Sequence, residues 1–591
     1  MANGMGSLMV GATGLRSSQT ALNTTAHNLS NVNTEGYTRQ QITFADSTYA
    51  NVFSKSLNKG KYGLGVDIDA ISRIRNEFID RSYRTESSRL GFYESQANAV
   101  YEVEDWFGEM QGVTYQQHIT NLYNAVNELT KNPTSTIARS SLIQNATAFI
   151  DRSEAIYSGL KDYQVTLNTE VNNMVEKINS LGQKIYNLNK GIVKVEAEGV
   201  ERANDLRDSR DLALDELSKY IDIDYYETKD GEVIVSAENV PFITKNDIAK
   251  MSVREEGTYG LLIPQWEGYQ QDVYNFDKQA NNANDTDKGK LKGLLIARGV
   301  IEVNYTDIPV MPERADYDLT TEQGMAEYNS AMDAYQQKQD YYNKYIEPSA
   351  ILSAIAGFDK LVNGIVTAMN DVLCPETTMD TTKELTDADG NILKAEKYVY
   401  NASTHDVLYD SHGNVVAGKE NGDGTYSYEA SEKLYVDANQ EETENIDSMT
   451  YKILDMSKAG YGMDDDETRG VELFKRNGTD RYKQITGADG STIYVRNNLN
   501  VTGFETDYTL GNLIVNPEAS QNVGTLPLST EHGKEDFSKV NELIDTFSKK
   551  FASLNPENYA KADFNTFYND YIGEFCLLYT SDAADDRISV D

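Results

Sequence analysis

The stretch from residue 156 to residue 195 reads IYSGLKDYQVTLNTEVNNMVEKINSLGQKIYNLNKGIVKV. Its apolar residues recur in alternating steps of four and three, with one exception, which is the heptad spacing of a coiled-coil seam. At 1.5 Å per residue, such a helix extends for about 60 Å. The stretch therefore predicts one long α-helix with a continuous packing seam. The seam consists of Ile156, Leu160, Leu167, Val171, Met174, Ile178, Leu181, Ile185, Leu188 and Ile192.

Other helical patterns in the chain could supply partners for this seam. Apolar residues recur at the same spacing in 352–372 and, with several tyrosines, in 325–342. Residues 72–130 also carry apolar side chains three and four positions apart. The chain has only 10 prolines in 591 residues, so long helices meet few breaks. We therefore predict a rod-like helical shaft.

The chain is strongly acidic, with 54 Lys and Arg against 93 Asp and Glu and a net charge of −39. Nucleic acid and anionic membranes are thereby disfavoured as main partners, because no excess of cations is present to replace their counterions. Two cysteines exclude a disulfide framework and a cysteine-based zinc site. No apolar run approaches the ~20 residues of a membrane span, and no charged region precedes an apolar stretch at the N-terminus. We expect a soluble protein without membrane insertion or a cleaved secretory signal.

Residues 5–29 carry a different helical pattern. Leu8, Leu15, Leu22 and Leu29 lie on one narrow apolar stripe in an almost uncharged segment. The sequence offers no obvious nearby partner for this stripe. We expect it to pack either on the C-terminal part of this chain or on neighbouring subunits.

The segment after this helix has the composition of a turn. Asn28, Asn31 and Asn33 compete for backbone hydrogen bonds, and Gly36 permits a tight turn just before Tyr37. The residues that follow, 37–44, have the pattern of an extended strand. The sequence thus predicts a helix, a sharp turn and a strand.

The sequence pattern changes from helical to β-like after residue 221. Asp230-Gly231 precedes a Val-Ile-Val run, which favours a β-hairpin. Residues 376–530 contain several Asp-Gly, Asn-Gly and His-Gly pairs between short Tyr- and Val-rich runs, which indicates a β-rich insertion. The expected fold class is α+β, a coiled-coil shaft with an inserted β-rich, outward-facing part. The expected domains are 1–60, N-terminal helix and turn; 61–220, helical shaft; 221–288, small β-containing segment; 289–375, helical return; 376–530, β-rich insertion; 531–575, second helical return; and 576–591, a tail.

Catalytic and metal-binding motifs are not found in the sequence. No zinc-peptidase motif, phosphate-binding loop or nucleophile elbow occurs. The acidic runs at 387–391 and 464–467 lack the ligand pattern of a calcium loop, so we interpret them as turns. We expect no enzyme activity, no catalytic or metal-binding residues and no cofactor. The scattered histidines are His27, His118, His405, His412 and His532.

Three stretches resemble one known family. Residues 28–39, which end in Gly-Tyr-Thr-Arg, resemble the signature shared by bacterial flagellar rod, hook and hook-associated proteins. The Gly-Tyr-Thr-Arg form is similar to the hook-associated proteins of the hook–filament junction. Residues 203–218 and 289–295 are similar to two further segments of that family. On these motifs the chain is identified as a member of the family.

This resemblance implies a structural, self-assembling protein that adapts the hook to the filament. It implies a ring-like oligomer in contact with the hook protein and a second hook-associated protein. It further implies an export chaperone, export through the type III apparatus and an extracellular place on the flagellum. The four stripe leucines would pack in the inner layer of the ring, and the turn residues would shape the connection below it. The alternatives are another axial protein, such as a hook or filament subunit, and a glycan-binding or hydrolytic module in the insertion.

The end of the chain departs from the family pattern. Residues 563–573 are similar to the family, which would continue with two more amphipathic helices. Residues 576–591 have no heptad pattern and resemble the translation of a sequencing read-through. We therefore expect a non-native tail after Phe575 and expect the helix that would pair with 5–29 to be missing. Reading the 3′ end of the gene from source DNA would test this expectation.

Overall fold

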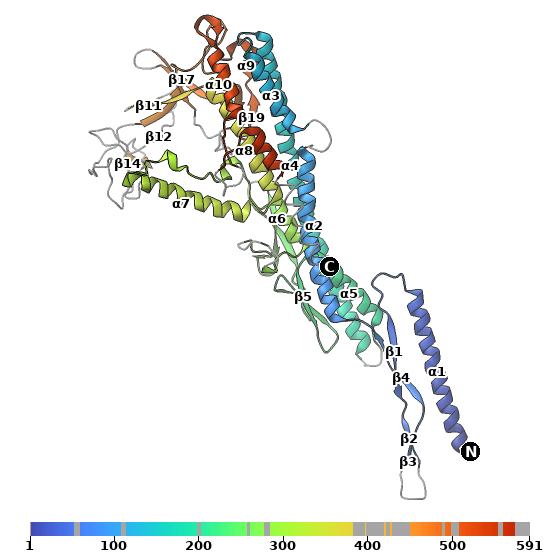
Figure 1. Cartoon of the computed structure of the whole chain (residues 1–591). Coiled ribbons are helices and arrows are strands. Elements are labelled where there is room, and N and C mark those ends of the chain that lie inside the picture. Colours follow the sequence, from blue (N-terminus) through green and yellow to red (C-terminus); the bar gives the residue numbers. More distant parts are fainter. Residues whose placement is uncertain are drawn as a thin grey trace. The chain divides into compact units, whose positions relative to one another are not determined.

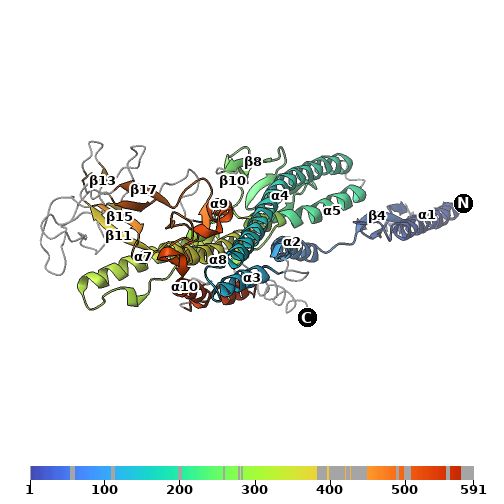
Figure 2. The same ribbon diagram turned by 90° about the horizontal axis from the view of Figure 1, so that it is seen from above.

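The computed structural model divides into two compact units (Figure 1). The first comprises 1–97 and 166–296, and the second comprises 98–165 and 297–591. Two long helices, α2 (Glu77–Phe107) and α4 (Thr136–Glu196), contribute residues to each unit, and α4 is continuous along its length (Figure 2). The structure describes residues 2–52, 60–107, 114–197, 202–256, 260–276, 280, 284–381, 396–397, 419–420, 426–427, 449–486, 491–497, 508–553 and 560–573.

The first unit begins with helix α1 (Ala2–Ser30), which lies along an antiparallel pair of strands (Figure 1). Strand β1 (Gln40–Asp46) pairs with β4 (Val66–Arg73), and β2 pairs with β3 beyond them. Two three-stranded antiparallel sheets, β5–β6–β7 and β8–β9–β10, follow helix α5. The remaining bounds are β2 Tyr49–Val52, β3 Gly60–Gly63, α5 Asn204–Tyr220, β5 Ile223–Glu227, β6 Val233–Ala237, β7 Val240–Ile243, β8 Met251–Glu256, β9 Leu261–Trp266, β10 Gln271–Asp272 and α6 Lys290–Arg298.

Within this unit, three asparagines of α4 pair with the backbone of the two small sheets. Each side-chain amide donates one hydrogen bond to a strand or turn carbonyl and accepts one from a strand N–H group. Buried backbone groups need partners, and an amide supplies one donor and one acceptor at once. The pairs are Asn168 with Gly260 O and Leu262 N (3.0 and 2.8 Å), Asn179 with Met251 O and N (2.8 and 2.9 Å), and Asn189 with Val233 O and N (2.7 and 3.1 Å).

The second unit is built around helix α8 (Ala350–Leu373). Its face is apolar along its whole length, with Ile351, Leu352, Phe358 and Ile365 fully buried. Among the described helices, α8 alone has the length and composition of a membrane span, and 72% of that window is buried within the protein. The same pattern is found in the core helices of water-soluble proteins, and α8 forms such a core here.

Helices and strands surround α8 in this unit. The main sheet has the antiparallel order β11–β15–β18–β17, and β16 pairs with β19. Asn370 of α8 repeats the amide pairing seen on α4, since it accepts from Leu473 N and Phe474 N and donates to Phe474 O. The bounds are α3 Tyr115–Leu129, α7 Glu322–Tyr345, β11 Glu376–Thr381, β12 Glu396–Lys397, β13 Lys419–Glu420, β14 Tyr426–Ser427, β15 Met449–Leu454, β16 Phe474–Arg476, β17 Tyr482–Thr486, β18 Thr492–Arg496, β19 Leu513–Val515, α9 Pro517–Gln521, β20 Ser529–Thr530, β21 Lys534–Glu535 and α10 Phe537–Ser548, and 564–573 are also helical.

An aromatic cluster fills the centre of the second unit. The ring of Phe358 lies edge-on to those of Phe107 and Tyr115, at 5.1 and 4.9 Å between centroids. Tyr568 and Tyr571, from the helix 564–573, complete the cluster, and Tyr571 donates a hydrogen bond to Ala354 O. Edge-to-face contacts of this kind add to the apolar burial. Side chains that are distant in sequence therefore hold these helices together.

Several sequence expectations differ from the structure in detail. The shaft expected from residue 61 begins at Glu77, because 60–63 form β3, which pairs with β2, and 66–73 form β4, which pairs with β1. The strand expected over 37–44 is β1, Gln40–Asp46. Over 168–189 the long helix contacts sheets as well as helices, because its asparagines satisfy strand backbones. The hairpin at Asp230-Gly231 is confirmed, with β5 paired to β6 and Gly231 at φ +85. The tail at 576–591 and the acidic run at 387–391 lie outside the described residues.

Candidate assembly surface

The leucine stripe of α1 is open to solvent. Leu8, Leu15, Leu22 and Leu29 are 76%, 75%, 70% and 74% exposed. They recur every seven residues, so they return to nearly the same side of the helix after two turns. A strict seven-residue stripe of leucines is the pattern that packs against another helix with a left-handed supercoil. No described residue of this chain covers it.

The opposite face of α1 is small and polar and rests on the strands of the β1–β4 hairpin. Ser17 is 6% exposed and donates to Val66 O at 3.4 Å. Thr13 donates to Val10 O and lies against Gly65, where a Cβ would come within 2.0 Å of the Thr13 hydroxyl. Small residues therefore let the hairpin approach the helix closely. The approach leaves the leucine stripe free on the other side.

Asn28 joins the end of α1 to the start of β1. Its Nδ2 donates to Gln40 O at 2.9 Å, and its Oδ1 accepts from Gln40 N at 2.9 Å and from the Tyr37 hydroxyl at 2.7 Å. His27 Nδ1 lies 2.9 Å from the same hydroxyl. Burial, with Asp208 and Asp205 nearby, raises the pKa of Tyr37. The Tyr37 hydroxyl thus keeps its proton and remains a donor at neutral pH.

The other turn residues have distinct positions. Asn31 Nδ2 donates to His27 O at 3.0 Å, which closes the last turn of the helix. Asn33 is exposed. Gly36 has φ +75, and a Cβ on it would lie 3.2 Å from Leu212 of α5. Gly36 therefore allows both the left-handed backbone and the close approach to α5.

A cluster of ion pairs fixes the base of the hairpin to α5. Arg73 Nη1 lies 2.7 Å from both Asp208 and Asp211, and these side chains are largely buried. Asp208 also accepts a hydrogen bond from Thr38 N at 3.2 Å. Burial raises the pKa of Asp211, but the neighbouring arginines outweigh it and the pKa is lowered overall. The acidic motif in 203–218 thus has a structural role, and its arginine partners are Arg73, Arg75 and Arg84.

Replacing Asn28 by alanine is expected to loosen the junction between α1 and β1. The change removes three hydrogen bonds and leaves the Gln40 backbone N–H and C=O without their partner. Each lost partner of this kind costs about 1 kcal/mol, so exchange of the Gln40 amide should accelerate roughly tenfold or more. Hydrogen exchange with peptide-level mass spectrometry measures this directly. Asn33→Ala, in the exposed part of the same turn, should leave that exchange unchanged, and equal acceleration in both variants would contradict the assignment.

The predicted seam of α4 is buried in the structure, apart from one position. Leu188 is half-buried. The other members are at most 8% exposed: Ile156, Leu160, Leu167, Val171, Met174, Ile178, Leu181, Ile185 and Ile192. These residues pack inside the chain, so the surface available to a partner is the α1 stripe and not the α4 seam.

The other candidate positions form turns and internal pairs. Asp464 accepts from the Thr468 N–H and hydroxyl groups, which makes 464–468 a closed turn. In the described residues of the chain, no three His, Cys, Asp or Glu side chains are grouped as metal ligands. His532 lies beside Glu467 on the surface.

A cleft of about 410 Å³ in the second unit contains Glu472 and Arg481. Burial raises the pKa of Glu472 to about 7, and its carboxylate accepts a hydrogen bond from the Tyr508 hydroxyl. Arg481 is paired with Asp371 and Glu376. Glu472 and Arg481 thus already have partners within the protein, as in a structural cluster.

Comparison with known proteins agrees with these features. Residues 100–330 match the family model of the flagellar hook-associated protein FlgK helical domain, and residues 8–38 match that of the flagella basal body rod protein. The flagellar hook-associated protein 1 of Bacillus subtilis is 30% identical over 310 residues, which cover 51% of this chain and 61% of that protein. Its namesake in Salmonella typhimurium is 26% identical over 213 residues, 36% of this chain and 37% of that protein.

A solved structure of the flagellar hook junction protein FlgK from Burkholderia pseudomallei aligns with 76% of this chain and 66% of its own, at 12% identity and a TM-score of 0.37. The chain spans 61% of the length of the Bacillus relative and 37% of the Salmonella relative. Over the parts that the two family models and these relatives cover, the chain is similar to FlgK-type flagellar hook-associated proteins.

Proposed function

We propose that this protein is a structural subunit of the bacterial flagellum, which assembles with copies of itself at the junction between hook and filament. The observation that carries the proposal is the exposed leucine stripe of α1, held in place by the Asn28 turn and the Arg73 ion pairs. Two matches support it: residues 8–38, which include the stripe, match the flagella basal body rod protein model, and residues 100–330, which include the long helix, match the FlgK helical domain model. The protein acts in this proposal by packing, without a catalytic step.

The stripe supplies the driving force for assembly. Burying one leucine side chain stabilises a contact by about 1.5–3 kcal/mol. Four leucines on one helix therefore provide enough apolar surface for a stable helix–helix contact. The partner helix comes either from the C-terminal part of the chain or from a neighbouring subunit.

The proposal includes the partners that a subunit at the hook–filament junction requires. The protein would contact the hook protein on one side and a second hook-associated protein on the other. It would reach the cell exterior through the type III export apparatus, with an export chaperone. The low helix propensity of the glycine-containing α1 fits a segment that orders on assembly, since each glycine costs about 1 kcal/mol relative to alanine.

Replacing Leu15 and Leu22 together by asparagine tests the proposal. In the source bacterium, we expect the double variant to lose motility and the protein to be absent from isolated hook–filament junctions, measured by swimming assays and immunogold electron microscopy. Both leucines are exposed, and substitutions at exposed positions change the free energy of unfolding by roughly ±0.5 kcal/mol. The melting temperature of the purified variant should therefore lie within about 2 °C of the wild-type value. Arg16→Asn, an exposed position about 100° around the helix from Leu15, is the matched control. Normal junctions in the double variant, or absence of the wild-type protein from flagella, would contradict the proposal.

A further inference from the structure

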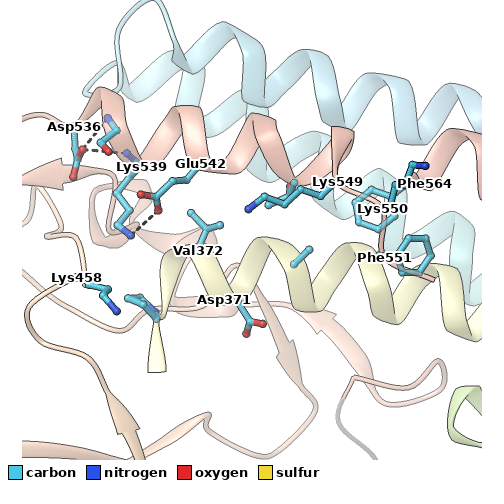
Figure 3. A pocket seen from close by; sticks show the side chains of 14 residues that line it. Asp371, Val372, Lys458, Asp536, Lys539, Glu542, Lys549, Lys550, Phe551 and Phe564 are labelled. Atoms are coloured by element: carbon cyan, nitrogen blue, oxygen red, sulfur yellow. Dashed lines mark hydrogen bonds and ion pairs between the residues drawn. The ribbon is translucent and has the colours of Figure 1, made fainter. Parts of the chain in front are cut away.

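A groove of about 600 Å³ lies between helices α8 and α10 of the second unit (Figure 3). Its floor is apolar, with Ala368 and Val372 from α8 only half-buried. The rings of Phe551 and Phe564 close one end (Figure 3). Phe551 rests on Gly364 of α8, where a Cβ would come within 2.4 Å of the ring. The groove is therefore a preformed surface with an apolar strip along its base.

The groove carries positive charge in a chain whose net charge is −39. Its acidic residues are already engaged: Asp536 caps α10, Glu542 pairs with Lys539 at 3.0 Å, and Asp371 pairs with Arg481 at 3.0 Å. Among the residues that the structure describes, Lys549 and Lys550 form no ion pair. The groove thus offers unneutralised ammonium groups beside apolar surface. The lining lysines are Lys458 and Lys539 towards one end and Lys549 and Lys550 towards the other (Figure 3).

The first unit presents a surface with the complementary pattern. Leu90 of α2 is 61% exposed and lies between Glu86 and Glu94, four residues away on either side. Residues i, i+4 and i+8 share one face of a helix. The two carboxylates are separated by about 12 Å along the helix, and Lys539 and Lys549 by about 15 Å at the same rise per residue. An apolar side chain between two carboxylates therefore matches an apolar strip between two lysine groups.

The carboxylates of α2 are available for a new partner. Glu86 contacts Arg89 at 3.1 Å, one turn away, and its side chain is 65% exposed. Exposed pairs of this kind contribute about 0–1 kcal/mol and exchange partners readily. Glu94 is exposed. Tyr83 and Ile79, exposed on the same side of α2, extend the apolar face.

We propose that α2 of one copy docks in the α8–α10 groove of a second copy, with Leu90 on the Val372 floor and Glu86 and Glu94 against the lysines. The contact joins two different surfaces, so each copy can bind one neighbour through its α2 and another through its groove. Repetition of such a heterologous contact produces a closed ring or an open helix of subunits. The inference rests on the proposed self-assembly and names the two faces that meet.

Cysteine cross-linking between differently labelled copies tests the contact. One full-length chain carries Leu90→Cys and the other carries Ala368→Cys, both with Cys576→Ser; the native Cys374 is fully buried, and burial raises its pKa to about 12, so it does not react. Mild oxidation of the mixture should give the Leu90→Cys/Ala368→Cys heterodimer at least tenfold above either chain alone. A chain with both cysteines should give trimers and larger species. Ser82→Cys, exposed on the same helix but about 80° around it, is the matched control and should give background yield.

Charge exchange tests the recognition itself. Lys549→Glu with Lys550→Glu in the groove copy should lower the heterodimer yield severalfold, and Glu86→Lys with Glu94→Lys in the other copy should restore it. The yield should fall in 1 M NaCl, where the Debye length is about 3 Å. A yield equal to that of the Ser82→Cys control, or no restoration on charge exchange, would overturn the inference and leave the groove to an acidic segment of a different protein. Absence of the protein from flagella would overturn the proposed function and leave this yield unchanged.

Discussion

Replacing Arg139 by alanine is expected to destabilise the second unit by about 3–5 kcal/mol. Arg139 lies on α4 with no exposed surface, and no carboxylate of the described residues pairs with it. Its Nε donates to Pro133 O at 2.8 Å, Nη1 to Leu526 O at 2.9 Å, and Nη2 to the Ser529 hydroxyl at 2.8 Å. Burial lowers the pKa of the guanidinium to about 10, so it remains charged at neutral pH. The residue holds 523–529 against the helix.

The alanine variant would leave this set of buried oxygens without donors. Each unsatisfied buried acceptor costs about 1–3 kcal/mol. Urea denaturation should therefore show a lower midpoint, and hydrogen exchange should accelerate first in 523–529. Arg152→Ala is the matched control on the same helix, because Arg152 donates one exposed hydrogen bond, to Trp106 O. Similar losses in the two variants would show that the 523–529 carbonyls do not depend on Arg139.

Replacing Glu238 by glutamine is expected to stabilise the first unit at high pH. Burial raises the pKa of Glu238 to about 7, Asp222 adds to this effect and Lys292 opposes it. Its Oε1 is buried and has no hydrogen-bond partner among the described residues. The unfolded chain releases this proton near pH 4.5, so the folded state binds more protons between pH 4.5 and 7. Stability therefore falls as pH rises through that window.

The glutamine variant removes this dependence. It should gain about 2–3 kcal/mol over the wild type at pH 8 and almost nothing at pH 4.5. Urea titrations at both pH values measure the difference. Glu232→Gln provides the contrast, because Glu232 is buried and pairs with Lys190 at 3.1 Å, so the loss of its charge should destabilise the protein. If the Glu238→Gln variant is more stable than the wild type by the same amount at pH 8 and at pH 4.5, the difference in stability comes from packing and not from ionisation of Glu238.

The long helix and the α1 stripe could be predicted because their information is local. The four-and-three spacing over 156–192 depends only on neighbouring residues in the sequence, and nine of its ten predicted positions are buried in the structure. The seven-residue spacing from Leu8 to Leu29 is equally visible. Periodicity shows that a face is apolar, but it does not show what covers that face. The exposure of the α1 leucines and the burial of the α4 seam could therefore not be distinguished.

The partners of polar residues could not be predicted in the same way. The sequence motif 203–218 contains the acids of the ion-pair cluster, but Arg73 and Arg84 lie more than a hundred residues earlier. Their pairing depends on how β4 and α2 pack against α5. Patterns among neighbouring residues in the sequence do not predict that packing. The asparagines of α4 are similar, since an isolated Asn in a helix is ordinarily a solvent-facing residue. Only the topology brings each of them to a strand with unpaired backbone groups.

Asn168, Asn179 and Asn189 also determine how the first unit bears load along the α4 axis. They are 11 and 10 residues apart, which is about 3.1 and 2.8 turns, so all three lie on one side of the helix within about 80° of one another. Each is joined to a strand by a donor and an acceptor. A force that slides the sheets along the helix must break all three joints together, whereas a peeling force would break them one at a time. The three asparagine joints therefore resist shear along α4 more strongly than they resist peeling.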